Sequence, residues 1–224
     1  MADKGPIERI PAPDETKRMV EALVERYAGQ ADYYASSSYN ETEARRDFID
    51  PFFSALGWDV ANEQGYAEPY REVIHEDAIR VGRDLRAPDY CFRVGGRRMF
   101  FVEAKKPSVS LKGDPAPAYQ LRRYGWSAHL PISALTDFEE LAVYECAQRP
   151  KPTEGAEVAR VDYLSYTDYL DRIDDIYWIF SKEAIFKGAF DRYAEGAKRK
   201  RGTQTVDQEF LAEIEAWRET LAKD

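Results

Sequence analysis

The stretch APDYCFRVGGRRMFFVEAKKP, residues 87–107, determines the fold that we expect. Two runs of residues that favour β-strands flank Gly95-Gly96, which is the pattern of a β-hairpin. Its ends carry charges that a buried sheet normally excludes. Asp89 opens the first strand, and Glu103 and Lys105 follow the apolar part of the second. These three charged side chains therefore need partners.

The turn of this hairpin decides whether the charges can meet. Residues i and i+2 of a strand point to one face, so Glu103 and Lys105 share a face. A two-residue Gly95-Gly96 loop pairs Asp89 with Val102 and turns the two acids apart. A three-residue loop or one β-bulge shifts the register by one and sets Asp89 opposite Glu103, with Cβ atoms about 5 Å apart. We favour the shifted register because it brings the three charges together.

Such a group of charges fits the hydrolysis of phosphodiester bonds. Two carboxylates that approach each other repel unless a cation lies between them. Carboxylate oxygens suit Mg²⁺, which keeps several waters and accepts phosphate oxygens. A lysine beside them can position an attacking water and offset the charge that develops on a phosphate. The alternative interpretation is an ordinary Asp–Lys or Glu–Lys ion pair at the end of a sheet.

Pro88-Asp89, followed after one hairpin by Glu103-Ala104-Lys105, resembles the PD-(D/E)xK nuclease superfamily. Gln120 and Tyr124 stand at positions i and i+4 of the next expected helix, on one face. They resemble the Q-x-x-x-Y motif of the RecB-type branch. The resemblance implies an α/β fold, a restriction-endonuclease-like core in which a central mixed sheet is flanked by helices.

The resemblance also implies a role for each of these residues. Lys105 would position the nucleophilic water. Gln120 and Tyr124 would support the site or the substrate phosphate. The implied Mg²⁺ ligands are Asp89, Glu103 and the main-chain carbonyl of Ala104.

Glu43 lies on the helix that precedes the sheet, where many of these nucleases place a further metal-associated acid. The resemblance therefore implies a catalytic role and a water-mediated metal contact for Glu43. Its position three residues after Asn40 equally fits the helix-capping box. Glu41 is the alternative acid.

Four longer stretches, residues 41–60, 87–108, 119–144 and 210–222, resemble the N-terminal nuclease region of large single-chain restriction–modification enzymes. These are the type IIG and type IIL enzymes, and the N-terminal domain of type I restriction subunits is more distant. The resemblance implies a Mg²⁺-dependent endonuclease domain that cleaves double-stranded DNA. It also implies a downstream methyltransferase and target-recognition region, which would bind S-adenosylmethionine. Because cleavage of both strands usually needs two copies of a nuclease site, we expect a transient dimer on DNA.

The distribution of charge is uneven. The whole chain has a net charge of −9 and a pI near 5.0, which by itself argues against nucleic-acid binding. Residues 97–123, however, contain seven basic and two acidic residues. The expected contacts to the DNA backbone are Lys106, Arg122 and Arg123, although Arg122 and Arg123 project to different sides of a helix and we do not expect both to touch DNA. The alternative is a solvated basic surface without a ligand.

The composition limits the remaining classes. The 224 residues, 44% of them hydrophobic, are enough for one sizeable core or for one domain with a helical appendage. Cys91 and Cys146 form no metal-binding spacing, so we expect neither a zinc site nor a disulfide scaffold. No 18-residue apolar run and no signal peptide are present, and we therefore expect a cytoplasmic protein without a membrane partner.

We expect a nuclease domain over residues 1–165 and a helical extension over 166–224. The helix at 206–224 ends without a stop signal, so we expect a connector toward a downstream methyltransferase region. Other expected helices cover 14–35, 40–57 and 117–128. We expect strands or extended segments over 58–64 and 70–76. Further expected strands lie in the hairpin and over 130–137 and 140–147, with a connecting loop at 81–88 and helices from 167 onward.

Two rival functions remain open at this point. One is a catalytically silent module on the same fold that binds DNA or docks a partner. The other is a nuclease that acts on RNA or, as an exonuclease, on ends. The five motif residues argue against a silent module. The Q-x-x-x-Y motif does not separate endonucleases from exonucleases.

Overall fold

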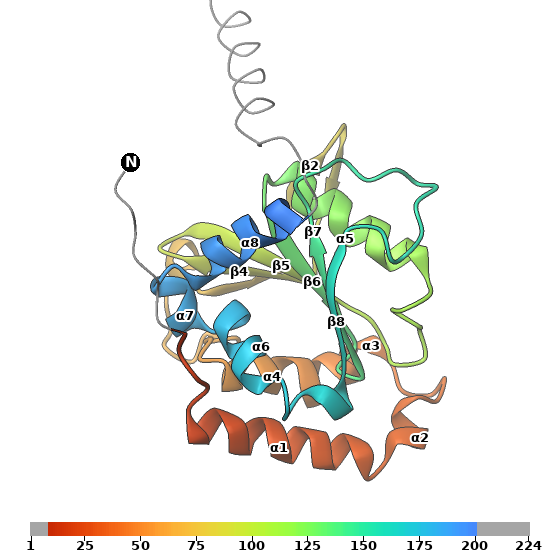
Figure 1. Ribbon diagram of the computed structural model, residues 1–224, viewed down its shortest axis with the longest axis vertical. Helices are drawn as coiled ribbons and strands as arrows, with labels where there is room; N and C mark the ends of the chain where they lie inside the picture. Colours follow the sequence, from red (N-terminus) through yellow and green to blue (C-terminus); the bar gives the residue numbers. More distant parts are fainter. Residues whose placement is uncertain (1–8, 201–224) are drawn as a thin grey trace, which may run out of the picture.

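The computed structural model of the protein describes residues 9–200, and it contains a mixed six-stranded sheet flanked by helices (Figure 1). This α/β architecture confirms the fold class that we expected from the sequence. The order of the strands in the sheet is β1-β4-β5-β6-β7-β8. Their bounds are β1 (Val73–His75), β4 (Tyr90–Val94), β5 (Arg97–Ala104), β6 (Ile132–Thr136), β7 (Glu140–Glu145) and β8 (Arg160–Ser165).

The β4–β5 hairpin and the parallel pair β5–β6 form the centre of the sheet. Helix α5 (Pro115–Ser127) makes the crossover that a parallel pair requires. The register pairs Ala104 with Thr136, so β5 and β6 end side by side at one edge of the sheet. Side chains that follow either strand are therefore brought to the same place.

Alternate residues of β5 enter two separate hydrophobic clusters on the two faces of the sheet. Phe100 packs among helices on one face, and its ring stacks on that of Phe92 with centroids 4.5 Å apart. Phe101 packs with Leu121 of α5 on the other face. The helices that contribute to the first cluster include α1 (Asp14–Ala28), α4 (Asp50–Ala55), α6 (Ile173–Phe180), α7 (Lys182–Phe186) and α8 (Ala189–Lys200).

The helix expected over residues 40–57 is continuous but contains a π-helical turn. It runs as α3 (Glu41–Ala44), the π-turn Arg45–Ile49 and then α4. Pro51 offers no N–H to the carbonyl of Asp47, four residues earlier. That carbonyl accepts a hydrogen bond from Arg26 Nη1 at 3.2 Å instead. The proline thus lies within the helical segment, and the departure from α geometry comes in the turn before it.

Two local expectations before the hairpin were wrong. Residues 81–88, expected as a loop, contain most of a second hairpin, formed by β2 (Ile79–Val81) and β3 (Asp84–Arg86). Residues 58–64, expected as a strand, form turns. The Asp59 carboxylate accepts the backbone N–H groups of the residues at 63 and 64, which closes the chain locally.

Two further elements differ from expectation. The helix expected over 14–35 stops at Ala28 and resumes as α2 (Ala31–Tyr34), because the backbone leaves helical geometry at Gln30, which has a φ of −143°. Strand β8 was not expected at all. It lies at the edge of the sheet and most of its residues are half-buried, so its sequence lacks a clear alternation of apolar and polar residues.

The described part of the expected C-terminal extension belongs to the same core as the sheet. Ile173 and Phe180 of α6, Ile185 of α7 and Phe190 of α8 are buried in the cluster that contains Phe100. The boundary expected after residue 165 therefore does not mark the end of the core. The helix expected at 206–224 lies outside the described residues.

The described helices include none that is both long enough and apolar enough to cross a membrane. Cys91 and Cys146 are buried and free, and burial raises the pKa of each thiol to about 12. Both thiols are therefore protonated at neutral pH.

Gly125 of α5 lies where a larger residue cannot fit. A Cβ atom at this position would come within 2.5 Å of Cys146 Sγ and 2.7 Å of its Cβ. Alanine normally stabilises a helix by about 1 kcal/mol relative to glycine. Gly125→Ala is instead expected to lower the free energy of unfolding by about 1–3 kcal/mol through overpacking, as measured by urea denaturation.

Gly29→Ala is the matched control. Gly29 has an ordinary helical φ of −65°, and the nearest atom to an added Cβ is 3.4 Å away. This variant should be as stable as the wild type or slightly more stable. Equal stability of Gly125→Ala and Gly29→Ala would contradict the tight α5–β7 packing.

Candidate active site at the ends of β4 and β5

The β4–β5 register sets Asp89 opposite Glu103. The turn is the two-residue loop Gly95-Gly96, and both glycines have positive φ angles of 57° and 80°. A β-bulge then shifts the register, because Phe92 pairs with Phe100 while the next residue, Arg93, pairs with Arg98. The expected one-residue shift is confirmed, and it comes from the bulge and not from a longer loop.

Beyond the bulge, Tyr90 pairs with Val102, and continuing this register by one residue sets Asp89, just before β4, opposite Glu103. Asp89 Oδ2 accepts a hydrogen bond from the backbone N–H of Ala104 at 2.8 Å. This bond holds the carboxylate against the end of β5. The two acids therefore lie on the same face, the one that α5 covers.

The Glu103 side chain is almost fully buried, at 3% exposure. Its Oε1 atom accepts hydrogen bonds from Lys105 Nζ, at 2.9 Å, and from Gln120 Nε2. Its Oε2 atom is also buried and has no hydrogen-bond partner in the described part of the chain. A buried carboxylate oxygen without a partner is costly, which makes Oε2 a candidate ligand atom.

Lys105 lies between carboxylates and the backbone. Its Nζ donates to Glu103 Oε1 and, at 2.7 Å, to the carbonyl of Ala104, and it lies 3.8 Å from Glu41 Oε2. The backbone N–H of Lys105 donates to the carbonyl of Thr136 at 3.0 Å. The parallel strand β6 therefore fixes where Lys105 leaves the sheet.

Gln120 and Tyr124 lie on the face of α5 that meets the sheet, as their i, i+4 spacing predicts. Gln120 Nε2 donates both to Glu103 Oε1 and, at 3.2 Å, to the Tyr124 hydroxyl. The N-cap of this helix is Asp114, whose side chain accepts the N–H of Ala116 at 2.9 Å. The structure therefore brings Gln120, Tyr124 and Glu103 together.

Within the described residues, Glu43 makes no hydrogen bond or ion pair with Asp89, Glu103 or Lys105. Its carboxylate accepts the backbone N–H of Asn40 at 2.9 Å, and Asn40 Oδ1 accepts the N–H of Glu43 at 3.0 Å. These two bonds form the capping box at the start of α3. The capping alternative expected for Glu43 is therefore the one seen here, and Glu41 is the acid that lies near Lys105.

Arg45 is a residue of the site that the sequence analysis missed. It begins the π-turn, and its Nη1 lies 3.6 Å from Asp89 Oδ1. Its guanidinium stacks 4.8 Å from the centre of the Tyr90 ring, and its Nε donates to the Tyr90 hydroxyl at 3.2 Å. π-turns often mark functional sites, but nothing in the sequence reveals one.

The electrostatics of the site favour an additional cation. Burial is the main reason that the pKa of Glu103 rises to about 7, and the charge of Asp89 raises it further. Burial lowers the pKa of Lys105, but the nearby carboxylates, Glu103 above all, outweigh burial and raise it. Burial also raises the pKa of Glu41. The carboxylates at the strand end are thus incompletely neutralised by Lys105 and Arg45.

The donor atoms at this strand end fit a hard cation such as Mg²⁺. Among the residues described, no three Asp, Glu, His or Cys side chains form a group that could by itself hold a metal ion. Mg²⁺ commonly uses one or two carboxylates and several waters, and so does not need such a group. Glu103, with its unpartnered Oε2, and Asp89 supply two carboxylates, and Ala104 supplies a carbonyl at the same strand end.

One of the three basic residues expected to contact DNA is unavailable. The side chain of Arg122 is 4% exposed, and its Nη1 forms an ion pair with Glu154 Oε2 at 2.7 Å. It faces the core side of α5, so the expected DNA contact of Arg122 is wrong. Arg123 and Lys106 are half-exposed, and their roles stay predictions.

Arg122→Ala and Arg123→Ala should therefore affect different properties, the first the stability of the protein and the second its binding to DNA. Arg122→Ala is expected to destabilise the protein by about 1–3 kcal/mol, because it leaves Glu154 without its partner and opens space beside α5. Arg123→Ala should leave stability within about 0.5 kcal/mol, while it weakens DNA binding and lowers the salt dependence. Thermal unfolding and binding to a labelled duplex at several salt concentrations measure the two effects. A loss of DNA affinity in a folded Arg122→Ala variant would contradict this assignment.

The mixed sheet flanked by helices is consistent with a restriction-endonuclease-like core. Over 210 residues the chain is 39% identical to the type II restriction enzyme and methyltransferase RM.Eco57I of Escherichia coli. The match covers 93% of this chain and 21% of that enzyme, so the chain spans about a fifth of the length of this curated relative. No protein-family model and no solved structure matches the chain. The identity over nearly the whole chain supports a restriction-enzyme-related domain.

Proposed function

We propose that this chain is a Mg²⁺-dependent DNA endonuclease domain, the cleavage module of a restriction–modification enzyme. The observation that carries the proposal is the meeting of Asp89, Glu103 and Lys105 at one strand end, through a register shift of one residue. The similarity to a restriction enzyme and methyltransferase supports it. The arrangement resembles the one expected for PD-(D/E)xK nucleases, with the Q-x-x-x-Y pair on α5.

Asp89, Glu103 and the Ala104 carbonyl would hold the ion. When bound, Mg²⁺ would polarise the phosphate and lower the pKa of a coordinated water. Lys105 Nζ would hold the attacking water and offset the charge that develops on the phosphate. Gln120, which donates to Glu103, would hold the orientation of that carboxylate, and the Tyr124 hydroxyl, which accepts from Gln120, would contact a phosphate oxygen.

Two nearby residues would act through these groups. Arg45 Nη1, 3.6 Å from Asp89 Oδ1, limits the repulsion between the two acids and positions Asp89. Glu41, 3.8 Å from Lys105 Nζ, would keep the ammonium charged and would offer a further water-mediated contact to the metal. In this role Glu41 replaces Glu43.

The substrate proposed here is double-stranded DNA. The relative combines a restriction enzyme and a methyltransferase in one protein, as its name states. We therefore propose that a downstream methyltransferase and target-recognition region, which would use S-adenosylmethionine, works with this domain. Cleavage of both strands would use two copies of the site, brought together in a transient dimer on DNA.

The test of this function is cleavage of supercoiled plasmid DNA by the whole chain with Mg²⁺, compared with the same reaction in EDTA. We expect nicked and linear products in the reaction with Mg²⁺ and none in the reaction with EDTA. If the protein binds DNA but cuts neither strand, it is a binding module instead. Conversion of a linear end-labelled duplex to mononucleotides, without nicking of circles, would identify an exonuclease.

A further inference from the structure

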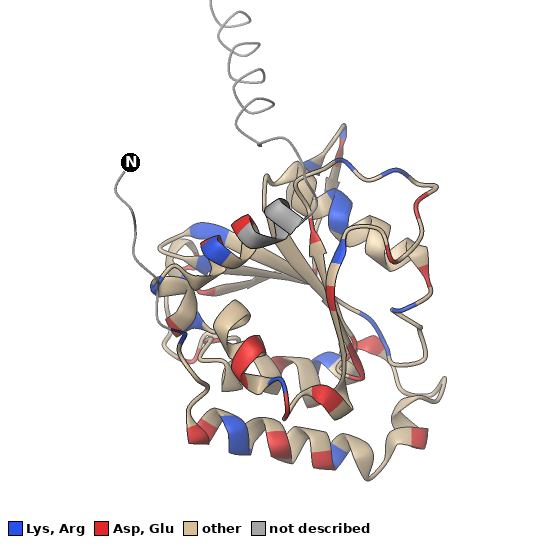
Figure 2. Cartoon of the chain, viewed as in Figure 1, with Lys and Arg blue, Asp and Glu red and all other residues tan. Residues whose placement is uncertain are grey.

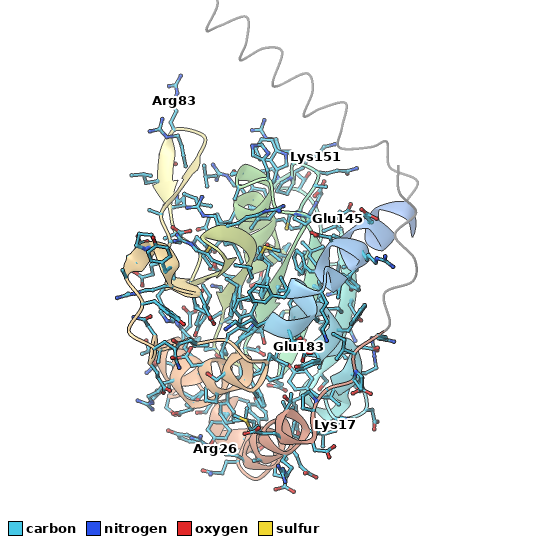
Figure 3. The ribbon with its side chains drawn as sticks, turned by 90° about the vertical axis from the view of Figure 1, so that its left-hand side faces the viewer. Lys17, Arg26, Arg83, Glu145, Lys151 and Glu183 are labelled. Atoms are coloured by element: carbon cyan, nitrogen blue, oxygen red, sulfur yellow. The ribbon has the colours of Figure 1, made fainter. Side chains whose placement is uncertain are left out.

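The β2–β3 hairpin projects from the body of the protein beside the candidate active site. It rises from the same side of the sheet as α5, and its tip stands clear of the other elements (Figures 1 and 3). Ile79 and Val81 are buried in the cluster that contains Leu121 and Tyr124 of α5. The hairpin is therefore anchored on one side to the helix that carries Gln120 and Tyr124.

The base of this hairpin adjoins the site. Arg86 ends β3, three residues before Asp89 in the chain. Burial and the charge of Glu103 raise the pKa of the Tyr124 hydroxyl, and the guanidinium of Arg86 acts against them. The backbone N–H of Glu76, just before β2, donates to the carbonyl of Asp89 at 3.2 Å. Both ends of the hairpin thus lead into the site.

The outer part of the hairpin carries more positive than negative charge. Arg80 and Arg83 are exposed, and within the described residues neither side chain makes an ion pair or a hydrogen bond. Arg86 contacts Asp84 at 3.4 Å, but both side chains are more than half exposed. Exposed pairs of this kind contribute little and are readily exchanged for other partners. Figure 3 shows Arg83 at the outermost point, and the ribbon in Figure 2 carries basic colouring at the tip with acidic colouring beside it.

An exposed leucine lies among these arginines. Leu85 pairs across the hairpin with Arg80, so both point outward, and Leu85 is 72% exposed. The tip is narrow because Gly82, with a φ of 66°, makes the turn with Arg83. A slim ribbon with arginines and one apolar residue on its outer face has the dimensions that a DNA groove accepts.

We propose that the β2–β3 hairpin is a DNA-binding ribbon that enters a groove next to the scissile phosphate. This inference rests on the proposed function, and it names the element that holds the substrate. Arg80 and Arg83 bind phosphates that flank the groove, and Leu85 is covered by a sugar or a thymine methyl group. Arg86, at the base, lies closest to the cleaved phosphate.

A protein partner fits these observations less well. Protein interfaces are centred on a buried apolar patch, but this hairpin offers a single exposed leucine between unpaired charges. The whole chain is acidic, with a net charge of −9, so an isolated positive ribbon stands out against it. Positive charge at the edge of a nuclease site complements the phosphate backbone.

The experiment measures duplex binding in EDTA, where cleavage does not interfere. Fluorescence anisotropy of a labelled duplex is recorded over a range of salt concentrations for three variants. Arg80→Ala/Arg83→Ala is expected to bind about 10-fold more weakly at low salt. Each lost phosphate contact removes about 0.9 from the slope of log affinity against log salt, so the slope should fall by about 2. Leu85→Ser should weaken binding and leave the slope unchanged, because it removes no charge.

Arg18→Glu is the matched control. It changes the net charge by the same amount as the double variant, and Arg18 is exposed on α1, which lies at the opposite end of the molecule (Figure 1). It should bind almost like the wild type. If the double variant binds DNA no more weakly than Arg18→Glu, the position of the positive charge on the hairpin does not matter. The inference then fails. Melting temperatures of all variants should match, since the substituted side chains are exposed.

The two proposals can fail separately. A wild type that binds and cleaves DNA, with hairpin variants that bind as well as the wild type, overturns the hairpin inference and leaves the nuclease proposal standing. A wild type that neither binds nor cleaves duplex DNA overturns both. A wild type that binds through the hairpin but does not cleave supports the inference and contradicts the nuclease.

Discussion

Replacing Asp89 with asparagine is expected to lower Mg²⁺-dependent plasmid cleavage by at least about 100-fold, the cost of removing one group that stabilises charge in an active site. Asparagine retains an oxygen that can accept the N–H of Ala104, so the strand end keeps its shape. The variant lacks only the negative charge that binds a cation. Cleavage rates measured over a range of Mg²⁺ concentrations should show that a higher concentration restores little activity.

Lys105→Ala should cause a similar loss for a different reason. It leaves both carboxylates in place, so Mg²⁺ should still bind while the attacking water and the phosphate lose their positive partner. The Mg²⁺ dependence of the residual activity should therefore stay close to that of the wild type. Asp32→Asn, an exposed acid on α2, is the control for a lost carboxylate and should cleave normally. Undiminished cleavage by both Asp89→Asn and Lys105→Ala would rule out this site as the catalytic centre.

Glu103→Gln is expected to stabilise the protein at pH 8 in EDTA while it abolishes cleavage. The pKa of Glu103 is about 7 in the folded protein and near its ordinary value of 4.5 in the unfolded chain. Below pH 4.5 the carboxyl is protonated in both states, and it contributes no pH-dependent stability. Between the two values only the unfolded chain loses the proton, so stability falls as the pH rises.

Above pH 7 Glu103 is ionised in the folded protein as well, and this lowers the unfolding free energy by its full amount, roughly 3 kcal/mol. Glutamine mimics the protonated form, so the variant should exceed the wild type in unfolding free energy by up to this amount at pH 8. The difference should shrink toward pH 5. Urea denaturation at several pH values measures it, and Glu21→Gln, at an exposed position of α1, should show no such trend.

With Mg²⁺ present, the wild type should become more stable than Glu103→Gln. An ion that binds the folded protein alone raises its stability by mass action, so Mg²⁺ should raise the melting temperature of the wild type. The Glu103→Gln variant lacks one ligand and should respond little. A variant that is less stable than the wild type at pH 8 in EDTA would show that Glu103 is a structural ion-pair partner of Lys105. The measurement thus separates a metal ligand from an ordinary salt bridge without any cleavage assay.

The hairpin and its charges could be predicted because all the determinants are local. Residues 87–107 contain both strands, the turn and three of the site residues, and α5 follows with Gln120 and Tyr124 at helical spacing. The shifted register could be inferred because only that register brings the acids together. Its origin in a bulge could not be chosen over a longer loop, since both give the same pairing at Asp89.

The remaining parts of the site depend on contacts that are distant in sequence. Glu41 on α3 lies near Lys105 and Arg45 on the π-turn lies near Asp89 only in the folded chain, and sequence spacing does not encode that geometry. The sequence places Arg122 and Arg123 on different sides of a helix, but it does not tell which of them faces the core. The two differ because Arg122 lies on the buried side of α5 and pairs with Glu154. Glu154 belongs to a loop whose position no local pattern predicts.

Because of the bulge in the β4–β5 hairpin, this site depends on whether the number of residues between Asp89 and Glu103 is odd or even. Asp89 and Glu103 share a face because one unpaired residue separates two regular stretches of pairing. Loss of a single residue between them would keep every charged side chain of the motif and every apolar side chain of the strands. It would nevertheless turn one carboxylate to the opposite side of the sheet. Relatives with the same letters but a different parity of spacing would therefore need a compensating bulge to keep the activity proposed here.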